Sequence, residues 1–208
     1  MKKISLAAFF TAISIFSINT AFAQFGDLKK SLGGGDKPAE SASAEQIVSK
    51  YVVGSKSVMT ADAKMLEAVG LKDEAAIANL QAKNLTEGAS KDSLEETAKI
   101  QTESSKALEA KLTGDKVKMD AASKKLFADG MKDLAGGVVK YVGMSKEVSS
   151  FKPSLGSVSG SGKSAIYIAK TLPDAIKNVG RTLKSSIDFA KANDIKVPKE
   201  ASDATSLL

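Results

Sequence analysis

The chain has 208 residues, of which 43% are hydrophobic and 26% charged, and a formal net charge of +6. It contains neither Cys nor His, which excludes disulfides, Ser-His-Asp triads, Cys-His pairs and the usual zinc sites. We therefore expect no cofactor, no metal and no enzymatic activity, and the sparse aromatic residues also argue against nucleic acid as a partner.

The first 23 residues have the pattern of a secretory signal peptide. Lys2 and Lys3 precede an apolar run from Ile4 to Ile18, and Ala21-Phe22-Ala23 offers small side chains at a cleavage site. An uncleaved anchor is the alternative, but it needs about 20 apolar residues and this run is shorter. The absence of Cys excludes a lipoprotein. We expect a periplasmic protein, or alternatively one secreted from the cell, that is not an integral membrane protein after cleavage.

A flexible lead-in and a first helix follow the signal. Residues 24–43 contain a glycine triplet, Pro38 and small polar residues, a composition that buries too little apolar surface to order itself. Ser43 stands three residues before Gln46, which is the spacing of a capping box. The apolar spacing after this cap predicts a helix from about Ala44 to Val69.

Two further helical stretches come next. The first starts at Asp73 and weakens at Gly88, and the second runs from about Asp92 to Leu112. The second has a thin apolar stripe in which Gln101 and Ser105 occupy two inward positions. An unsatisfied buried polar group costs about 1 to 3 kcal/mol, so we expect this helix at a wet margin of the core.

A fourth helix, from about Lys116 to Ser150, carries four glycines: Gly130, Gly136, Gly137 and Gly143. Each glycine costs about 0.8 to 1 kcal/mol relative to Ala inside a helix, so a structural gain should offset them. Gly136 and Gly143 lie seven residues apart and hence on one face. This spacing predicts close packing of a partner helix, with a kink or a ligand groove as the alternative.

The last part of the chain combines a hinge, a helical region and a tail. Residues 153–162 are rich in Gly and Ser, and the helical pattern from Lys163 meets Pro173, which predicts a break near Leu172. Residues 196–208 are expected to form a loose tail. Because no alternating strand pattern competes, we predict an all-α fold: an elongated antiparallel bundle of four to five helices, as one domain over residues 44–195.

The final helix is strongly amphipathic. Its basic side chains fall within about 80° of one another at 100° per residue, which makes them candidate contacts to an anionic surface. These residues are Lys170, Lys177, Arg181, Lys184 and Lys191. An ordinary solvated face is the alternative. It is favoured because burying each large aliphatic residue opposite them contributes about 1.5 to 3 kcal/mol, against about 1 kcal/mol per basic residue at a membrane.

The leading functional hypothesis is an exported, non-enzymatic helical bundle that binds a protein or a cell-envelope component. The alternative is a carrier of a lipid or another apolar ligand. Its groove would be lined by Phe127, Met131, Leu134, Val138, Ile176, Val179 and Leu183. A hydrolase using Ser and Lys is a third hypothesis, which requires a buried Lys with a perturbed pKa beside a Ser in a cleft.

Overall fold

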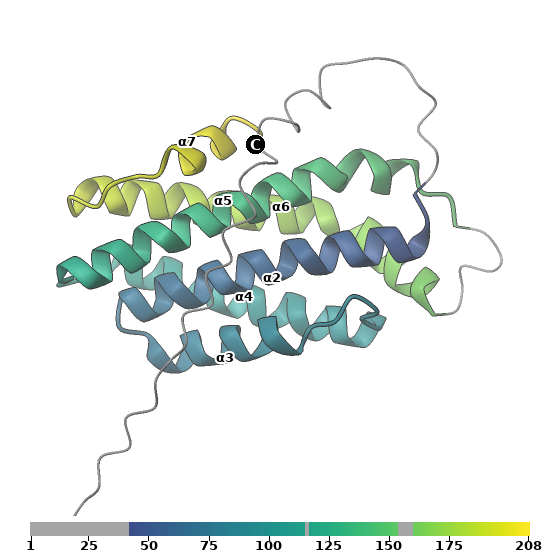
Figure 1. Ribbon diagram of the computed structural model, residues 1–208, viewed down its shortest axis with the longest axis horizontal. Helices are drawn as coiled ribbons and strands as arrows, with labels where there is room; N and C mark the ends of the chain where they lie inside the picture. The colour runs from purple at the N-terminus through teal and green to yellow at the C-terminus, as the bar shows by residue number, and fades with distance from the viewer. Residues whose placement is uncertain (1–41, 115–116, 154–159) are drawn as a thin grey trace, which may run out of the picture. The chain divides into compact units, whose positions relative to one another are not determined.

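The computed structural model describes residues 42–114, 117–153 and 160–208, and within them six helices and no strands (Figure 1). The helices are α2 (Ala44–Ala68), α3 (Lys72–Asn84), α4 (Lys91–Thr113), α5 (Ala121–Ser150), α6 (Ser161–Ala192) and α7 (Lys199–Thr205). The all-α prediction is confirmed for this part of the chain. The signal pattern at 1–23, the lead-in up to residue 41 and residues 154–159 of the expected hinge lie outside the described residues.

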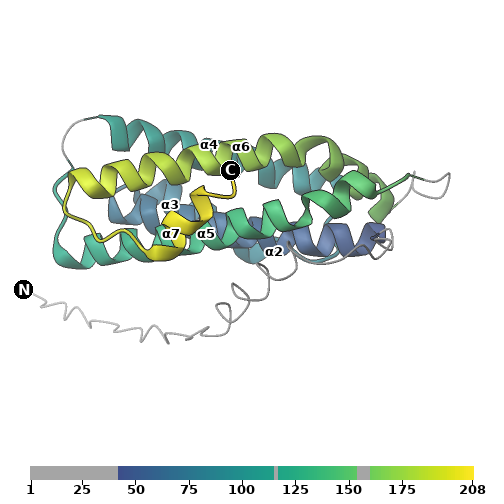
Figure 2. The ribbon, with the colours of Figure 1, turned by 90° about the horizontal axis from the view of Figure 1, so that it is seen from above.

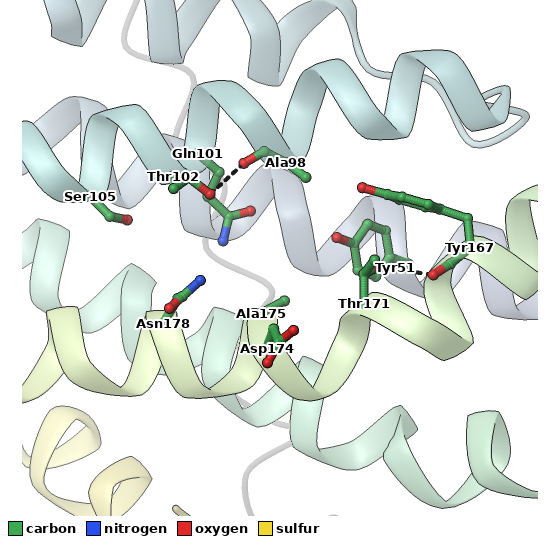
Figure 3. A pocket seen from close by; sticks show the side chains of 10 residues that line it. All are labelled: Tyr51, Ala98, Gln101, Thr102, Ser105, Tyr167, Thr171, Asp174, Ala175 and Asn178. Carbon is green, nitrogen blue, oxygen red and sulfur yellow. Dashed lines mark hydrogen bonds between the residues drawn. The ribbon is translucent and has the colours of Figure 1, made fainter.

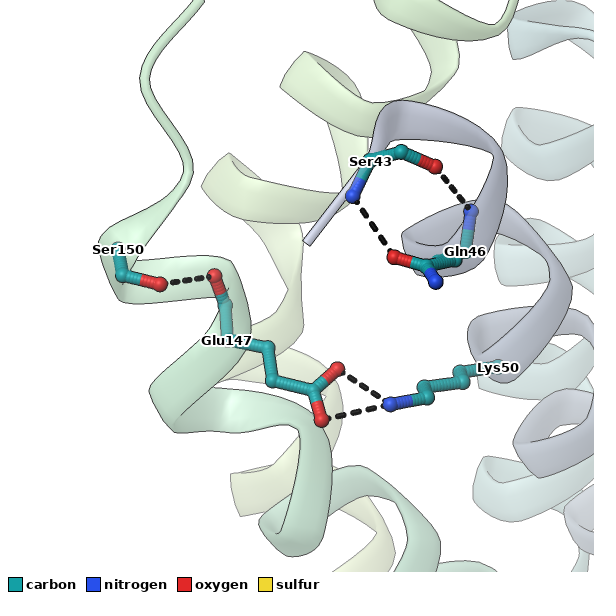
Figure 4. Close-up of polar contacts among 5 residues, drawn as sticks. All are labelled: Ser43, Gln46, Lys50, Glu147 and Ser150. Carbon is teal, nitrogen blue, oxygen red and sulfur yellow. Dashed lines mark hydrogen bonds and ion pairs between the residues drawn. The ribbon is translucent and has the colours of Figure 1, made fainter. Parts of the chain in front are cut away.

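The first helix begins at the cap that the sequence predicts (Figure 4). The Ser43 backbone N–H donates to Gln46 Oε1 at 2.9 Å, and the Gln46 N–H donates to Ser43 Oγ at 3.3 Å, which completes a capping box. One turn later, Lys50 forms an ion pair with Glu147 at 2.6 Å. The start of α2 is thus tied to the end of α5.

Helix α2 is the centre of the packing, because it contacts α3, α4, α5 and α6. Helix α5 runs antiparallel to α2, as the pairs Lys50–Glu147 and Lys64–Asp133 show. Helices α4 and α6 instead lie side by side and run in the same direction (Figure 2). The expectation of purely antiparallel neighbours is wrong for this pair, because α5 separates the two in sequence and returns the chain before α6 begins.

Glycines allow α2 and α5 to approach closely, but the pair involved differs from the predicted one. A Cβ at Gly137 would lie 2.5 Å from Val58 Cγ2, and a Cβ at Gly130 would lie 2.6 Å from Met65 Cγ. A Cβ at Gly136 would meet only Lys140 Nζ, at 3.9 Å. The close contact therefore uses Gly130 and Gly137, which are also seven residues apart, and these glycines serve tight helix packing.

Alanine substitutions at two adjacent glycines are expected to have opposite effects. Gly137→Ala should lower the free energy of unfolding by about 1 to 3 kcal/mol, because the new methyl group overlaps Val58 and forces α2 away. Gly136→Ala should raise it by about 0.8 to 1 kcal/mol, because only helix propensity changes there. Urea denaturation of both variants measures the free energy of unfolding. Equal changes in the two variants would contradict the close approach of α2 and α5 at Gly137.

Helix α6 continues through Pro173, so the predicted break near Leu172 is wrong. Proline removes one backbone donor and costs about 3 kcal/mol in a helix interior. Leu172 and Val179 are each about 1% exposed, and burial of such side chains on both sides of Pro173 offsets that cost. Pro173 itself is exposed, so its ring does not enter the core.

The expected loose tail is also wrong where α7 forms. Ala201 and Ala204 are fully buried, Glu200 pairs with Lys132 at 3.4 Å, and a Cβ at Gly180 would lie 2.7 Å from Leu208 Cδ1. A seven-residue helix is too short to be stable alone in water. Its order comes from packing on α5 and α6, which local sequence patterns do not encode.

Candidate ligand slot between α4 and α6

A small cavity, which we call the α4–α6 slot, opens between these two parallel helices (Figure 3). Its volume is about 150 Å³. It is lined by Ala98, Gln101, Thr102 and Ser105 of α4, by Tyr167, Thr171, Asp174, Ala175 and Asn178 of α6, and by Tyr51 of α2. The slot exists because side chains such as Ala98, Ser105 and Ala175 are too small to fill the space between the helices.

The sequence predicts Gln101 and Ser105 at a wet margin of the core, but the structure buries both side chains and gives each a protein partner. Gln101 is 6% exposed and Ser105 is 4% exposed. Gln101 Oε1 accepts a hydrogen bond from the Tyr141 hydroxyl at 3.2 Å, and Ser105 Oγ donates to Asp62 Oδ2 at 3.5 Å. These contacts lower the cost of burying polar groups beside the slot.

Two tyrosines support the floor of the slot. Tyr51 stacks on Tyr141 with ring centroids 5.3 Å apart, and the Tyr141 hydroxyl lies 2.8 Å from Ser55 Oγ. Burial raises the pKa of Tyr51 to about 12 and the pKa of Tyr141 well above its ordinary value. Both phenols are neutral at pH 7, and Tyr141 uses its hydroxyl hydrogen in the bond to Gln101 Oε1.

A buried carboxyl group lies next to this floor. Asp62 is fully buried, and its Oδ1 has no hydrogen-bond partner in the described part of the chain. Burial raises its pKa to about 8, the charge of Glu109 adds to the rise, and the hydrogen bond from Ser105 opposes it. Asp62 is not among the residues singled out from the sequence, although its position between Val58 and Leu66 on the apolar face of α2 is a signal of burial.

The five predicted basic residues lie on one exposed face of α6: Lys170, Lys177, Arg181, Lys184 and Lys191. Arg181 Nε donates to Glu109 Oε1 at 3.0 Å, and the same oxygen accepts from Thr182 Oγ1 at 2.9 Å. The Glu109 carboxylate of α4 therefore already pairs with Arg181, one of the five basic residues. Contact of this face with an anionic surface stays a prediction.

The residues predicted to line an apolar groove belong to the packed core. Phe127, Met131, Leu134, Val138, Val179 and Leu183 are at most about 1% exposed, and Ile176 is partly buried against them. Phe127 also packs on Phe189, with ring centroids 5.3 Å apart. None of the seven lines the α4–α6 slot. A ligand could use this groove only if α5 and α6 separated.

A wider recess of about 610 Å³ lies where α5 begins and where α6 connects to α7. Its lining is mixed in charge: Lys124, Lys125, Lys132, Lys196 and Lys199 occur with Asp129, Asp194 and Glu200, beside Ala128, Ile195 and Pro198. Lys125 pairs with Asp129 and Lys132 with Glu200, so these ion pairs already use part of the charge.

The structure brings one Ser and one Lys together. Lys140 Nζ donates to Ser57 Oγ at 2.8 Å, and partial burial lowers the pKa of Lys140. Ser57 Oγ already donates its own hydrogen to the Val53 carbonyl at 3.1 Å. Neither Ser57 nor Lys140 lines the α4–α6 slot or the wider recess. These two cavities therefore do not supply the cleft that the hydrolase hypothesis requires beside the pair.

No protein family model matches the chain, and neither curated proteins nor solved structures gave a match. Among the described residues, no group of Asp and Glu side chains could hold a metal ion. The same residues include no helix with the length and apolar character needed to cross a membrane. The α4–α6 slot is therefore the candidate binding site.

Proposed function

We propose that the protein is an exported, non-enzymatic helical bundle that binds a protein or a cell-envelope component through the α4–α6 slot. The observation that carries the proposal is a cavity whose walls are lined by amides and hydroxyls from two neighbouring helices. Figure 3 shows the side-chain amides of Gln101 and Asn178 directed toward each other across it. Export rests on the signal pattern at residues 1–23.

The size of the slot limits what it can hold. An apolar cavity of about 150 Å³ accommodates a molecule the size of benzene, whereas sites for whole drug-sized ligands range from about 300 to 1,000 Å³. The slot has a volume of about 150 Å³. It therefore suits one side chain or one terminal group of a larger partner better than a complete lipid, and this favours the binding hypothesis over the carrier.

Filling the slot tests the proposal. Ala98→Leu extends a side chain into it, and Ala110→Leu adds the same side chain at an exposed position of α4 outside it. Native mass spectrometry of the protein recovered from its export compartment should show a bound component on the wild type and on Ala110→Leu. Its occupancy on Ala98→Leu should fall at least tenfold. Equal occupancy on both variants, or a wild type without any bound component, would sink the proposal.

A further inference from the structure

Three hydroxyl groups of the α4–α6 slot have already donated their hydrogens elsewhere. Thr102 Oγ1 donates to the Ala98 carbonyl at 2.8 Å, and Thr171 Oγ1 donates to the Tyr167 carbonyl at 3.0 Å, as Figure 3 shows. Ser105 Oγ donates to Asp62. A hydroxyl that donates inward offers only oxygen lone pairs to a ligand. On these three residues the slot is a set of hydrogen-bond acceptors.

The residues that line the slot carry only negative formal charge. Asp174 is the one charged residue among the ten that line the slot, and no Lys or Arg is among them. Tyr51 and Tyr167 lie together at one end of the slot (Figure 3). Tyrosine rings attract cations through their negative faces, and a carboxylate attracts them directly. Asp174 is exposed and lies beside Ala175, between the tyrosines and Asn178 (Figure 3). Together the carboxylate and the rings would disfavour an anionic group.

The side-chain amides of Gln101 and Asn178 supply the hydrogen-bond donors that the three hydroxyl groups do not offer. Gln101 Oε1 accepts from Tyr141, which leaves the Gln101 amide N–H groups as donors, and the amide of Asn178 faces them. A ligand that fits both ends of the slot therefore carries strong donors near the tyrosines and Asp174. It carries an acceptor a few atoms away, beside Gln101 and Asn178.

We infer that the α4–α6 slot binds an organic ammonium group, either on a small amine or at the end of a lysine side chain of a partner. The inference rests on the proposed function, because it names the chemistry that the same slot recognises. An ammonium group provides three N–H donors and a positive charge, which match the acceptors, the carboxylate and the aromatic rings.

A pair of probes that differ in one group tests the inference. The full chain is titrated at pH 7 with 4-aminobutan-1-ol and with butane-1,4-diol, which have the same number of heavy atoms, while NMR follows the side-chain amides of Gln101 and Asn178. The dissociation constant of the amine should be about five- to tenfold lower than that of the diol. Equal affinities, or a wild type whose amide signals do not move with the amine, would overturn it.

Two carboxamide variants locate the charge that selects the amine. Asp174→Asn should abolish the preference for the amine, and Asp188→Asn, an exposed position of α6 outside the slot, should keep it. A preference that survives Asp174→Asn would also contradict the inference. If both probes bind equally and Ala98→Leu blocks both, the ammonium inference fails while the slot remains a binding site. If Ala98→Leu still retains the component bound in the export compartment, the proposed function itself is contradicted.

Carbodiimide coupling separates the two sources of ammonium. The reagent adds to a carboxylate to give an O-acylisourea, and an amine held against it then forms an amide bond while the reagent leaves as a urea. Protein from the export compartment is coupled, digested and read by mass spectrometry, with Asp174→Asn as the control. A low-mass amide at Asp174 indicates a small amine, and a cross-linked peptide indicates a lysine of a partner. Identical coupling patterns for wild type and Asp174→Asn would count against the inference.

Discussion

Replacing Asp62 with Asn is expected to remove a large pH dependence of stability between about pH 4 and pH 8. Burial raises the pKa of Asp62 from an ordinary value of 3.8 to about 8, so the folded protein keeps this proton over a range in which the unfolded chain has lost it. The free energy of unfolding therefore decreases as pH rises through this window. The decrease is about 1.4 kcal/mol per pH unit and levels off above pH 8.

The Asn variant carries a neutral side chain of nearly the same shape at every pH. It should be clearly more stable than the wild type at pH 8 and comparable to it near pH 4. Urea denaturation of both proteins at several pH values gives the difference in the free energy of unfolding, which isolates Asp62 from the other titrating groups. Asp188→Asn, at an exposed position of α6, serves as the control and should retain the slope of the wild type. A difference that does not change with pH would contradict a neutral buried Asp62.

Truncating Phe127 to Ala is expected to lower the free energy of unfolding by about 3 to 5 kcal/mol. The side chain is fully buried and packs on Phe189, so its removal leaves a cavity that the surrounding helices fill only in part. The control is Ile77→Ala on α3, where the side chain is 54% exposed and the change should stay within about 0.5 kcal/mol.

The Phe127 result also separates the two uses considered for this residue. A side chain at the wall of an empty apolar groove would leave little new cavity when truncated, and its loss would cost far less. A loss of less than about 1 kcal/mol in the free energy of unfolding would therefore contradict the packed core and support the apolar groove. The measurement is the midpoint and slope of urea denaturation, with circular dichroism confirming that the variant remains helical.

Features that depend on neighbouring residues in the chain were predictable. The helical class, the Ser43 cap of α2 and its end before Gly70, which has a φ of +90°, all follow from local hydrogen bonding and backbone conformation. The weakening at Gly88 was also found, although the cap of α4 is Ser90, two residues before the expected start. Such signals act over one or two helical turns, so a single sequence contains them.

Features that depend on distant residues were not predictable. Which glycine contacts α2 was misjudged, since Gly136 and Gly137 are adjacent and only the rotation of α5 against Val58 distinguishes them. The slot was missed because its walls come from α2, α4 and α6. The sequence shows the polar residues Gln101 and Ser105 in the apolar stripe of α4. It does not show that α6 lies parallel to α4 and makes this stripe one wall of a cavity.

The sequence by itself determined the helical class, the cap of α2 and the residue types that are missing, because propensity, capping and chemistry reside in single side chains and short spacings. It also predicts export, from the pattern at residues 1–23. The tertiary structure decided that α6 runs through Pro173, that α7 is ordered, that Asp62 is buried and that the slot exists. Each of these depends on burial against segments far away in the chain, and that burial outweighs the local preference.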